Sequence, residues 1–475
     1  MKIYNTLTKR KEDFLPLDGK NVKMYACGIT VSGDAHIGHA YQALIYDIIR
    51  KYLVKKGYDV TYARNYTDVD DKIIARSHET GIPADEYAEM MIKKIDAEMR
   101  ALEVDDPDIW LKATATMQGI EDFISKLIAS GHAYATPEGD VYFAVDSFPG
   151  YGKLSGRNLE DARESVRIEN EENKRNPLDF ALWKSAKPGE PFWHSPWGDG
   201  RPGWHIECSA MNMQAFGEQI DIHGGGRDLI FPHHENEIAQ TEALTGKQFA
   251  KYWIHNGLIK VNGQKMSKSL GNSLLLADLL EKYHPEVIKF ALLQTNYRGD
   301  INVTDALFPD AEKHMLSFYK VMAEAESKEL TLDGQDEDID RAFNEAMDDD
   351  FNTAKALADL FAVFKAAGAK LRTGDLAGAN DMLGQVKKTY SLLGLFRADP
   401  AEFVQKCEAK HRSDIPAEVT ELVRKRADAK AAKDWTTADA IRARLTEMGW
   451  SVRDTKEGAV VESCLLYTSP SPRDS

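Results

Sequence analysis

The chain has 475 residues, 43% of them hydrophobic and 29% charged, a composition typical of a soluble globular protein with several domains. No apolar run approaches the ~20 residues that cross a bilayer, and no secretory signal opens the chain, so we expect a cytoplasmic protein that binds no membrane. The net charge of −16 argues against a protein that coats nucleic acid by charge alone, although a local basic patch can still bind RNA.

The N-terminal region predicts one strand–helix–strand unit. Residues 21–29 predict a short buried strand, and apolar spacing from about His36 to Lys56 predicts a helix. Gly57 lies where that helix would end, and residues 59–66 predict a second strand. Such a unit begins a doubly wound parallel sheet, so we expect ligands at the turn between the first strand and the helix.

The middle of the chain changes character and then returns to the sheet pattern. Residues 116–203 are rich in Gly, Pro and Trp, which indicates an insertion between two halves of the sheet. Residues 219–222 predict a strand and residues 232–244 predict a helix. Residues 258–261, followed by Asn262-Gly263, predict a hairpin with a tight primed turn.

The C-terminal third is expected to be helical. Residues 307–396 show the helical pattern, residues 401–418 are polar and predict a linker, and a compact unit follows to about residue 461. Residues 462–475 match no preceding element and are interpreted as a disordered or foreign tail. The basic residues between 421 and 444 are either an RNA-binding patch or a solvated helix face.

Four cysteines stand far apart and form no Cys-x-x-Cys pair: Cys27, Cys208, Cys407 and Cys464. They are too few and too scattered for a disulfide framework. A metal site would therefore have to be assembled from distant parts of the chain.

Two short motifs suggest that the chain binds a nucleotide. His36-Ile37-Gly38-His39 opens the first helix, where free N–H groups and two imidazoles suit phosphate, and Gly38 lets a nucleotide lie close. By itself this pattern could also be two histidines that bind a metal, or two exposed histidines without a function. Lys265-Met266-Ser267-Lys268-Ser269 follows the hairpin, and its lysines could hold the β- and γ-phosphates, although a mobile basic loop is the alternative.

Together the two motifs resemble class I aminoacyl-tRNA synthetases. Further stretches are similar to cysteinyl-tRNA synthetases, and the resemblance runs from residue 1 to about 461. These stretches are residues 25–28, 64–72, 174–180, 203–211 and 221–237.

The resemblance implies an α/β fold: a split Rossmann-like catalytic domain with a parallel sheet and an inserted connective domain, then an α-helical domain and a small anticodon-binding domain. The expected boundaries are 1–115 and 204–306 for the two catalytic halves, 116–203 for the insertion, 307–400 for the helical domain, 401–461 for the anticodon domain and 462–475 for the tail.

The resemblance also implies one Zn²⁺ per chain, held by Cys27, Cys208, His233 and Glu237. The residue types agree, because His233 and Glu237 are four apart on one helix face and zinc accepts mixed S, N and O ligands. The alternatives are inert buried thiols beside a capped helix, or a purely structural zinc. A substrate role is favoured because zinc binds thiolate well and has little affinity for the hydroxyl of serine, a near-isostere that shape alone rejects poorly.

The resemblance assigns the remaining roles. The expected reaction activates L-cysteine with Mg²⁺-ATP and transfers it to tRNA-Cys, with the chain acting as a monomer. Catalytic roles fall to His36, His39, Lys265 and Lys268; ATP contacts to Gly38, Asp228 and Lys268; the substrate pocket to Cys27, Trp204 and His223; and anticodon contacts to Trp435, Asp439 and Asp454.

Several of these assignments have alternatives. Trp204 and Trp435 could be core residues, and the glycines before Asp228 could be a tight turn. Residues 32–35 and 40–42 depart from the family pattern around the first motif, where Asp34 could still cap the helix. An amino-sugar ligase with the same chemistry and a non-catalytic paralogue are the rival functions.

Overall fold

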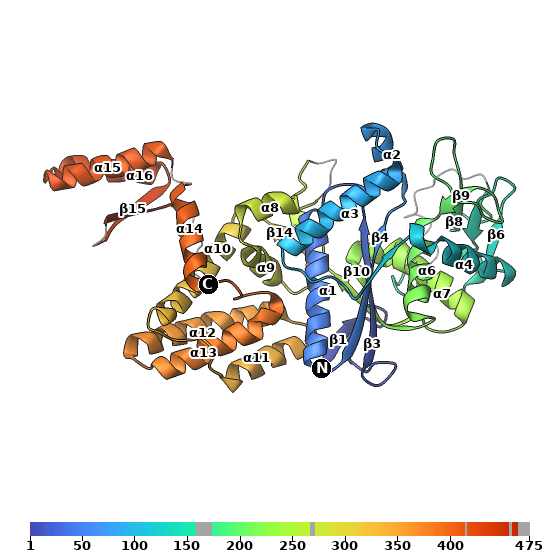
Figure 1. Cartoon of the computed structure of the whole chain (residues 1–475), viewed down its shortest axis with the longest axis horizontal. Coiled ribbons are helices and arrows are strands. Elements are labelled where there is room, and N and C mark those ends of the chain that lie inside the picture. Colours follow the sequence, from blue (N-terminus) through green and yellow to red (C-terminus); the bar gives the residue numbers. More distant parts are fainter. Residues whose placement is uncertain (158–172, 267–270, 414–415, 456–457, 464–475) are drawn as a thin grey trace. The chain divides into compact units, whose positions relative to one another are not determined.

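The structure is a computed structural model that describes residues 1–157, 173–266, 271–413, 416–455 and 458–463. The chain divides into two compact units (Figure 1). The first unit comprises residues 1–303, 336–363 and 388–395, and the second comprises residues 304–335, 364–387 and 396–475.

The first unit is built on a five-stranded parallel sheet. In spatial order its strands are β11 (Ala250–Asn256), β10 (Ile220–Gly226), β3 (Asn21–Thr30), β4 (Asp59–Thr67) and β5 (Ile109–Lys112). The predicted unit of β3, α1 (Ile37–Lys55) and β4 is confirmed. Strand order reverses between β3 and β10, so a topological switch point, where such sheets bind ligands, lies between them.

Helices cover both faces of this sheet (Figure 1). α1 and α3 (Ala84–Ala101) lie on one side, while α6 (Trp204–Phe216) and α7 (Glu235–Thr245) lie on the other. α2 (Asp71–Thr80) connects β4 to α3. Because side chains alternate along a strand, neighbouring residues of β4 face different helices. Asn65 faces α6, whereas Arg64 and Tyr66 face α1 and α3.

The helix predicted from residue 232 begins later than expected. α7 starts at Glu235 and is preceded by a π-helical turn over Ile230–His234. The backbone of Phe231 is extended inside that turn, with φ −139° and ψ 132°, so a regular helix cannot begin there. His233 nevertheless remains one turn before Glu237.

The predicted insertion lies between β5 and β10 in sequence. It contains α4 (Met117–Ala129) and an antiparallel sheet of β6 (Ala133–Ala135), β7 (Val141–Phe143), β8 (Phe180–Ser185) and β9 (Gly200–Pro202). Phe143, Trp183 and Ile120 are buried in one cluster that also includes Ile206 of α6. The insertion therefore packs against α6 of the second catalytic half.

The predicted hairpin is confirmed. β12 (Ile259–Val261) and β13 (Gln264–Lys265) pair antiparallel, and Asn262 and Gly263 both have positive φ, as primed turns require. The remaining elements of this part are β1 (Lys2–Asn5), β2 (Arg10–Asp13), α8 (Leu276–Lys282), α9 (Pro285–Leu293) and β14 (Ile301–Val303).

Helices follow from residue 307, as predicted. They are α10 (Leu307–Glu326), α11 (Glu337–Asp348), α12 (Thr353–Thr373) and α13 (Leu376–Tyr390). Among the described residues, no helix is both long enough and apolar enough to cross a bilayer.

The linker predicted over residues 401–418 is wrong, because most of it is a helix, α14 (Pro400–Ser413). Phe403 and Cys407, one turn apart, are both buried. The Phe403 ring stacks on Tyr319 of α10 with centroids 4.0 Å apart, and Asp399 accepts a hydrogen bond from the N–H of Glu402 at the helix start. A polar sequence with two apolar residues at helical spacing was sufficient for a packed helix.

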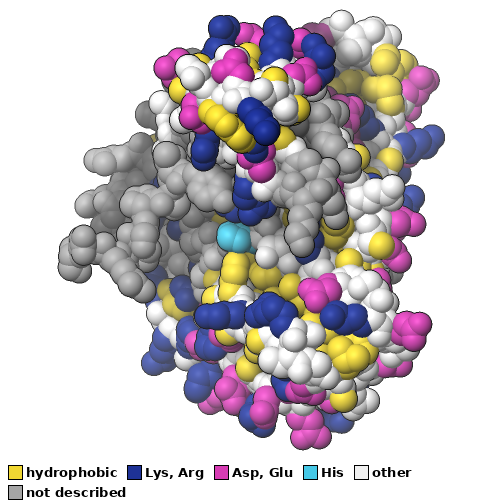
Figure 2. All heavy atoms as spheres, turned by 90° about the vertical axis from the view of Figure 1, so that its left-hand side faces the viewer, with side chains coloured by type: hydrophobic (Ala, Val, Ile, Leu, Met, Phe, Trp, Pro, Cys, Tyr) yellow, Lys and Arg dark blue, Asp and Glu magenta, His cyan; other side chains and the backbone are white. Residues whose placement is uncertain are grey.

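The last part of the second unit is a small α/β element with its own core. It comprises α15 (Ala417–Ala431), α16 (Trp435–Glu447), β15 (Trp450–Thr455) and β16 (Gly458–Ser463). Val419, Leu445 and Val452 form the core. β16 extends two residues beyond the expected boundary at 461, and residues 464–475 lie outside the described part. Cations and carboxylates are interspersed on the face drawn in Figure 2.

Candidate active site and metal centre

The predicted phosphate-binding motif lies at the N-terminus of α1. His36 is the N-cap, and its Nδ1 accepts a hydrogen bond from the N–H of Gly38 at 3.1 Å. His39 Nδ1 accepts from the N–H of His36 at 3.3 Å, and the two rings stack with centroids 3.6 Å apart. Both imidazoles are therefore held at the helix mouth, where free N–H groups favour phosphate.

The prediction that Asp34 caps this helix is wrong. His36 supplies the cap, and Asp34 instead pairs with Lys94 of α3 at 2.5 Å. Two other departures from the family pattern also have defined places. Tyr41 is fully buried, and Gln42 donates a hydrogen bond to the carbonyl of Cys27 at 2.5 Å.

The segment after the hairpin returns to the mouth of α1. The Leu274 carbonyl accepts from the first N–H of α1 at 2.9 Å, and the Leu274 N–H donates to Met266 Sδ at 3.4 Å. A Cβ on Gly38 would lie 3.6 Å from the Met266 methyl carbon. The fold thus brings the two motifs together. Lys265 is exposed at the end of β13, and Lys268 lies outside the described residues.

The four predicted metal ligands converge from separate elements. Cys27 lies in β3, Cys208 in α6, His233 in the π-helical turn and Glu237 in the first turn of α7. All four are buried, and one ligand atom from each lies within 4.8 Å of the others. Two thiols, an imidazole and a carboxylate are a donor set that zinc accepts.

The separations among these atoms fit a single ion. The two Sγ atoms are 3.8 Å apart, Cys27 Sγ lies 3.4 Å from Glu237 Oε1, and His233 Nε2 lies 3.0 Å from the same oxygen. Bonds of ~2.0–2.3 Å to a tetrahedral ion place ligands roughly 3.3–3.8 Å apart. The observed distances need only small adjustments to reach that range.

A second donor set shares two of these residues. Cys27, His223, His234 and Glu237 also bring their ligand atoms within 4.8 Å of one another. His223 Nε2 lies 2.8 Å from Glu237 Oε2, and His234 Nε2 lies 3.3 Å from Cys27 Sγ. The sequence analysis gave His234 no role. The signal that could have identified it is its place directly after His233.

The electrostatics of the cluster favour a cation. Burial and a hydrogen bond to Cys208 raise the pKa of the Cys27 thiol, and the same hydrogen bond lowers the pKa of Cys208. Burial disfavours charge on Glu237 and His233, but their opposite-charge neighbours outweigh it. The pKa of Glu237 falls to about 2 beside His223 and His233, and the pKa of His233 rises to about 10 beside Glu237 and Cys208.

Asn65 ties β4 to the metal cluster, a role that sequence reasoning missed. Its Oδ1 accepts from the Tyr25 hydroxyl and the Gly28 N–H, each at 2.9 Å, and lies 3.8 Å from Cys208 Sγ. A Cβ on Gly28 would lie 1.6 Å from the Asn65 carbonyl oxygen, so only glycine fits after Cys27. The signal that could have identified this role is the place of Asn65 within residues 64–72, one of the stretches that resemble the family.

Buried histidines outside the predicted ligand set hold the rings in place. His205 Nδ1 lies 3.0 Å from His233 Nδ1, and His255 Nε2 lies 2.7 Å from His234 Nδ1. Burial lowers the pKa of His205, and it lowers the pKa of His255 to about 3, so both stay neutral. Neutral rings of this kind fix the orientation of metal-ligating imidazoles.

The predicted substrate-pocket and ribose residues also have defined places. Trp204 is 40% exposed and stacks on His233 with centroids 4.3 Å apart, so it is not a core residue. Asp228 is exposed in the short turn Arg227–Leu229. The glycines before it belong to β10, so their interpretation as a tight turn is wrong.

The predicted anticodon residues differ in how available they are. Trp435 is 58% exposed at the start of α16, so it is not a core anchor, and Asp439 is exposed on the same helix. Asp454 accepts two hydrogen bonds from Arg426, each of 2.9 Å, and one from Lys430 of 2.8 Å. These bonds lower the pKa of Asp454 and occupy its oxygens.

Three family models match the chain. The model described as tRNA synthetases class I (C) catalytic domain matches residues 13–313. The DALR domain model matches residues 342–397, and the cysteinyl-tRNA ligase anticodon binding domain matches residues 412–460. The matches follow one another along the chain and leave residues 1–12, 314–341, 398–411 and 461–475 outside them.

Curated relatives match the chain over nearly its whole length. A cysteine–tRNA ligase from Maridesulfovibrio salexigens is 46% identical, over 97% of this chain and 99% of that protein. A cysteine–tRNA ligase from Pseudomonas aeruginosa (strain LESB58) is 48% identical, over 96% of this chain and 98% of that protein.

Solved structures share the fold. A leucyl-tRNA synthetase from Agrobacterium radiobacter, in a ternary complex, has a TM-score of 0.56 at 12% identity and covers 84% of this chain and 86% of that one. Mycobacterium tuberculosis methionyl-tRNA synthetase with methionyl-adenylate has a TM-score of 0.54 at 14% identity, over 81% of this chain and 91% of that one. The catalytic-domain model and the whole-length relatives together show that the chain belongs to the cysteine–tRNA ligases, a family of class I aminoacyl-tRNA synthetases.

Proposed function

We propose that this protein activates L-cysteine with Mg²⁺-ATP and transfers it to the 3′ end of tRNA-Cys. The observation that carries the proposal is the position of the metal cluster beside the phosphate-binding helix. Gln42, in the second turn of α1, donates a hydrogen bond to the carbonyl of Cys27. A substrate held by its sulfur near Cys27 would therefore lie close to a nucleotide at the helix mouth.

The first step needs no side-chain nucleophile. The cysteine carboxylate would attack the α-phosphate, and His36 and His39 would donate hydrogen bonds as charge develops on the phosphate oxygens. Lys265 and Lys268 would stabilise the departing pyrophosphate, Gly38 would lie against the nucleotide, and Asp228 would accept from ribose hydroxyls. Positioning and electrostatics supply most of the rate.

Cysteine selection would rest on one Zn²⁺ per chain, held by Cys27, Cys208, His233 and Glu237. When bound, the ion supplies a strong preference for thiolate over a neutral hydroxyl. Trp204 and His223 would wall the amino-acid pocket, and His234 would orient Cys27 from outside the ligand set. The alternative set with His223 and His234 is less favoured, because it contains one thiolate rather than two.

Transfer RNA would be recognised by the C-terminal element. Trp435, with its exposed ring, would stack on an unpaired base, and Asp439 would accept from a base edge. Asp454 would instead orient Arg426. We also propose that the chain works as a monomer in the cytoplasm. The domain boundaries that we propose are those expected from the family resemblance.

The test is cysteine-dependent exchange of labelled pyrophosphate into ATP, followed by charging. We expect exchange with cysteine and at least about 100-fold less with serine, and cysteinylation of tRNA but not of an amino-sugar. Cys208→Ser should lose both zinc and exchange, whereas Cys407→Ala, which removes a thiol of α14, should retain both. Absence of cysteine-dependent exchange in zinc-loaded protein would refute the proposal, and transfer to the amino-sugar instead of tRNA would favour the rival ligase.

A further inference from the structure

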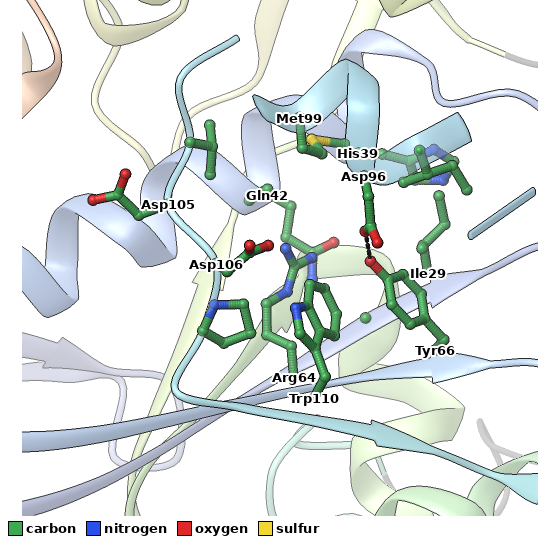
Figure 3. A pocket seen from close by; sticks show the side chains of 15 residues that line it. Ile29, His39, Gln42, Arg64, Tyr66, Asp96, Met99, Asp105, Asp106 and Trp110 are labelled. Atoms are coloured by element: carbon green, nitrogen blue, oxygen red, sulfur yellow. Dashed lines mark hydrogen bonds between the residues drawn. The ribbon is translucent and has the colours of Figure 1, made fainter. Parts of the chain in front are cut away.

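A pocket lies on the opposite face of the parallel sheet from the metal cluster. The carboxyl halves of β3 and β4, with Trp110 near the start of β5, form its floor, and α1 and α3 cover it (Figure 3). The alternation that directs Asn65 toward Cys208 directs Arg64 and Tyr66 into this pocket. His39 also lines it, so an occupant would touch the phosphate-binding motif.

Arg64 is the unusual residue of this pocket. Its side chain is only 8% exposed, and its Nε has no hydrogen-bond acceptor among the described residues. Within that part of the chain the guanidinium also makes no ion pair, and it lies 5.7 Å from the centre of the Trp110 ring. A buried guanidinium stays charged and is costly without an anionic partner. The geometry therefore indicates an anionic group on the ligand.

Carboxylates in the same pocket restrict what that ligand can be. Asp96 and Asp106 project into the pocket in Figure 3, whereas Asp105 points away from it. Asp96 accepts a hydrogen bond from the Tyr66 hydroxyl, and Asp106 accepts from Arg100 at 3.4 Å. Two carboxylates would repel a phosphate or another polyanion, but they can also accept from an ammonium group.

Apart from His39 and Gln42, the rest of the lining is apolar. Ile29 and Met99 contribute aliphatic walls, and the Trp110 ring is fixed by stacking on Tyr66 with centroids 4.2 Å apart and planes 10° apart. Such walls suit a small apolar body between the charged ends of a ligand.

We propose that this pocket binds a free α-amino acid with a small apolar side chain. Arg64 would pair with its carboxylate, Asp106 and Asp96 would accept from its ammonium group, and the side chain would lie against Trp110. The sheet separates this site from the metal cluster, so the proposal does not depend on the cysteine site.

The test uses the full chain and ligands that cannot coordinate a metal through sulfur. Saturation-transfer NMR would compare L-valine with isovalerate, which lacks the ammonium group, and isobutylamine, which lacks the carboxylate. Valine should bind saturably, and each half-ligand should bind about tenfold more weakly or worse, because one charge-assisted interaction is lost.

Matched variants separate the two charged contacts. Arg64→Met should abolish binding of both valine and isovalerate, whereas Asp106→Asn should weaken valine, which carries an ammonium group, and should not weaken isovalerate. Arg76→Met, which removes an exposed guanidinium from α2, should bind valine as the unsubstituted chain does. If Arg64→Met fails to fold, Asp106→Asn still carries the test.

Three results would overturn the proposal. They are the absence of saturable valine binding, equal valine binding by a folded Arg64→Met variant, and inorganic phosphate competing better than isovalerate. The last result would identify a simple anion site. None of these results bears on cysteine-dependent pyrophosphate exchange, so the proposed function is tested independently of this pocket.

Discussion

At the scale of single residues, Glu237 is the residue on which the metal centre depends. One carboxylate oxygen lies 3.0 Å from His233 and the other lies 2.8 Å from His223, and the first also lies 3.4 Å from Cys27 Sγ. The residue can therefore serve either donor set. The sets differ in their other two members, which are Cys208 and His233 in one and His223 and His234 in the other.

Two glutamine substitutions distinguish these histidines. His233→Gln should lower zinc affinity by about 100-fold or more, because it removes a ligand next to both thiols. His234→Gln should lower it by only about tenfold, as expected for a residue that orients a ligand. Competition with a chromophoric chelator measures both affinities. A larger loss in His234→Gln than in His233→Gln would assign the metal to the alternative set.

The protonation of the ligands in metal-free protein predicts how many protons zinc displaces. At pH 7.5 Cys27 carries a proton because its pKa is raised, and His233 carries one because its pKa is about 10. Glu237, with a pKa of about 2, is already ionised, and the lowered pKa of Cys208 favours its thiolate. Zinc binding should thus release about two protons and strengthen about 100-fold per pH unit near neutrality. Calorimetry in buffers of different ionisation enthalpy measures the number, and a value near zero would contradict these protonation states.

At the scale of elements, α14 shows how few apolar residues can hold a helix in place. Phe403 is 2% exposed and stacks on Tyr319 of α10, while Lys410 pairs with Glu312 of the same helix at 2.8 Å. The helix thus buries Phe403 and, one turn later, Cys407.

Phe403→Ala should destabilise the second unit by about 3 kcal/mol, the usual cost of truncating a buried aromatic ring. Urea unfolding followed by far-UV circular dichroism measures the change. Gln405→Ala, an exposed position on the same helix, is the control and should change stability by less than about 0.5 kcal/mol. Equal effects of the two substitutions would mean that α14 does not depend on this contact.

Elements with a strong periodic pattern could be predicted from the sequence, and elements fixed by tertiary contacts could not. β3, α1 and β4 match their predicted bounds to within about a residue, because their apolar spacing is regular. α14 was missed because its burial depends on α10, and the π-helical turn before α7 was missed because no local propensity encodes it.

The same distinction applies within the candidate site. Cys27 and Glu237 could be placed by motif and helical spacing. Asn65 and Arg64 could not be assigned, because their roles depend on which face of β4 each side chain takes. That choice is set by strand pairing over distances that the sequence pattern does not reveal.

At the scale of the whole molecule, the two compact units differ in their metal chemistry. Both donor sets found among the described residues consist of residues of the first unit. A ligand that binds only the folded state stabilises the part that must fold to form its site. Zinc should therefore act on the two units unequally.

Hydrogen exchange measured by mass spectrometry, with and without saturating zinc, resolves this difference by segment. Zinc should slow exchange in β3, α6 and α7, which carry the ligands, by about 100-fold when the free ion is at 100 times its dissociation constant. Exchange in α10 and α14 should stay unchanged, because no donor set includes their residues. In Cys208→Ser the zinc effect on the first unit should disappear, and this variant is the control for non-specific binding. Slower exchange of α10 and α14 with zinc would contradict the expectation that the two units unfold independently. It would mean that the metal stabilises both units through one shared unfolding step.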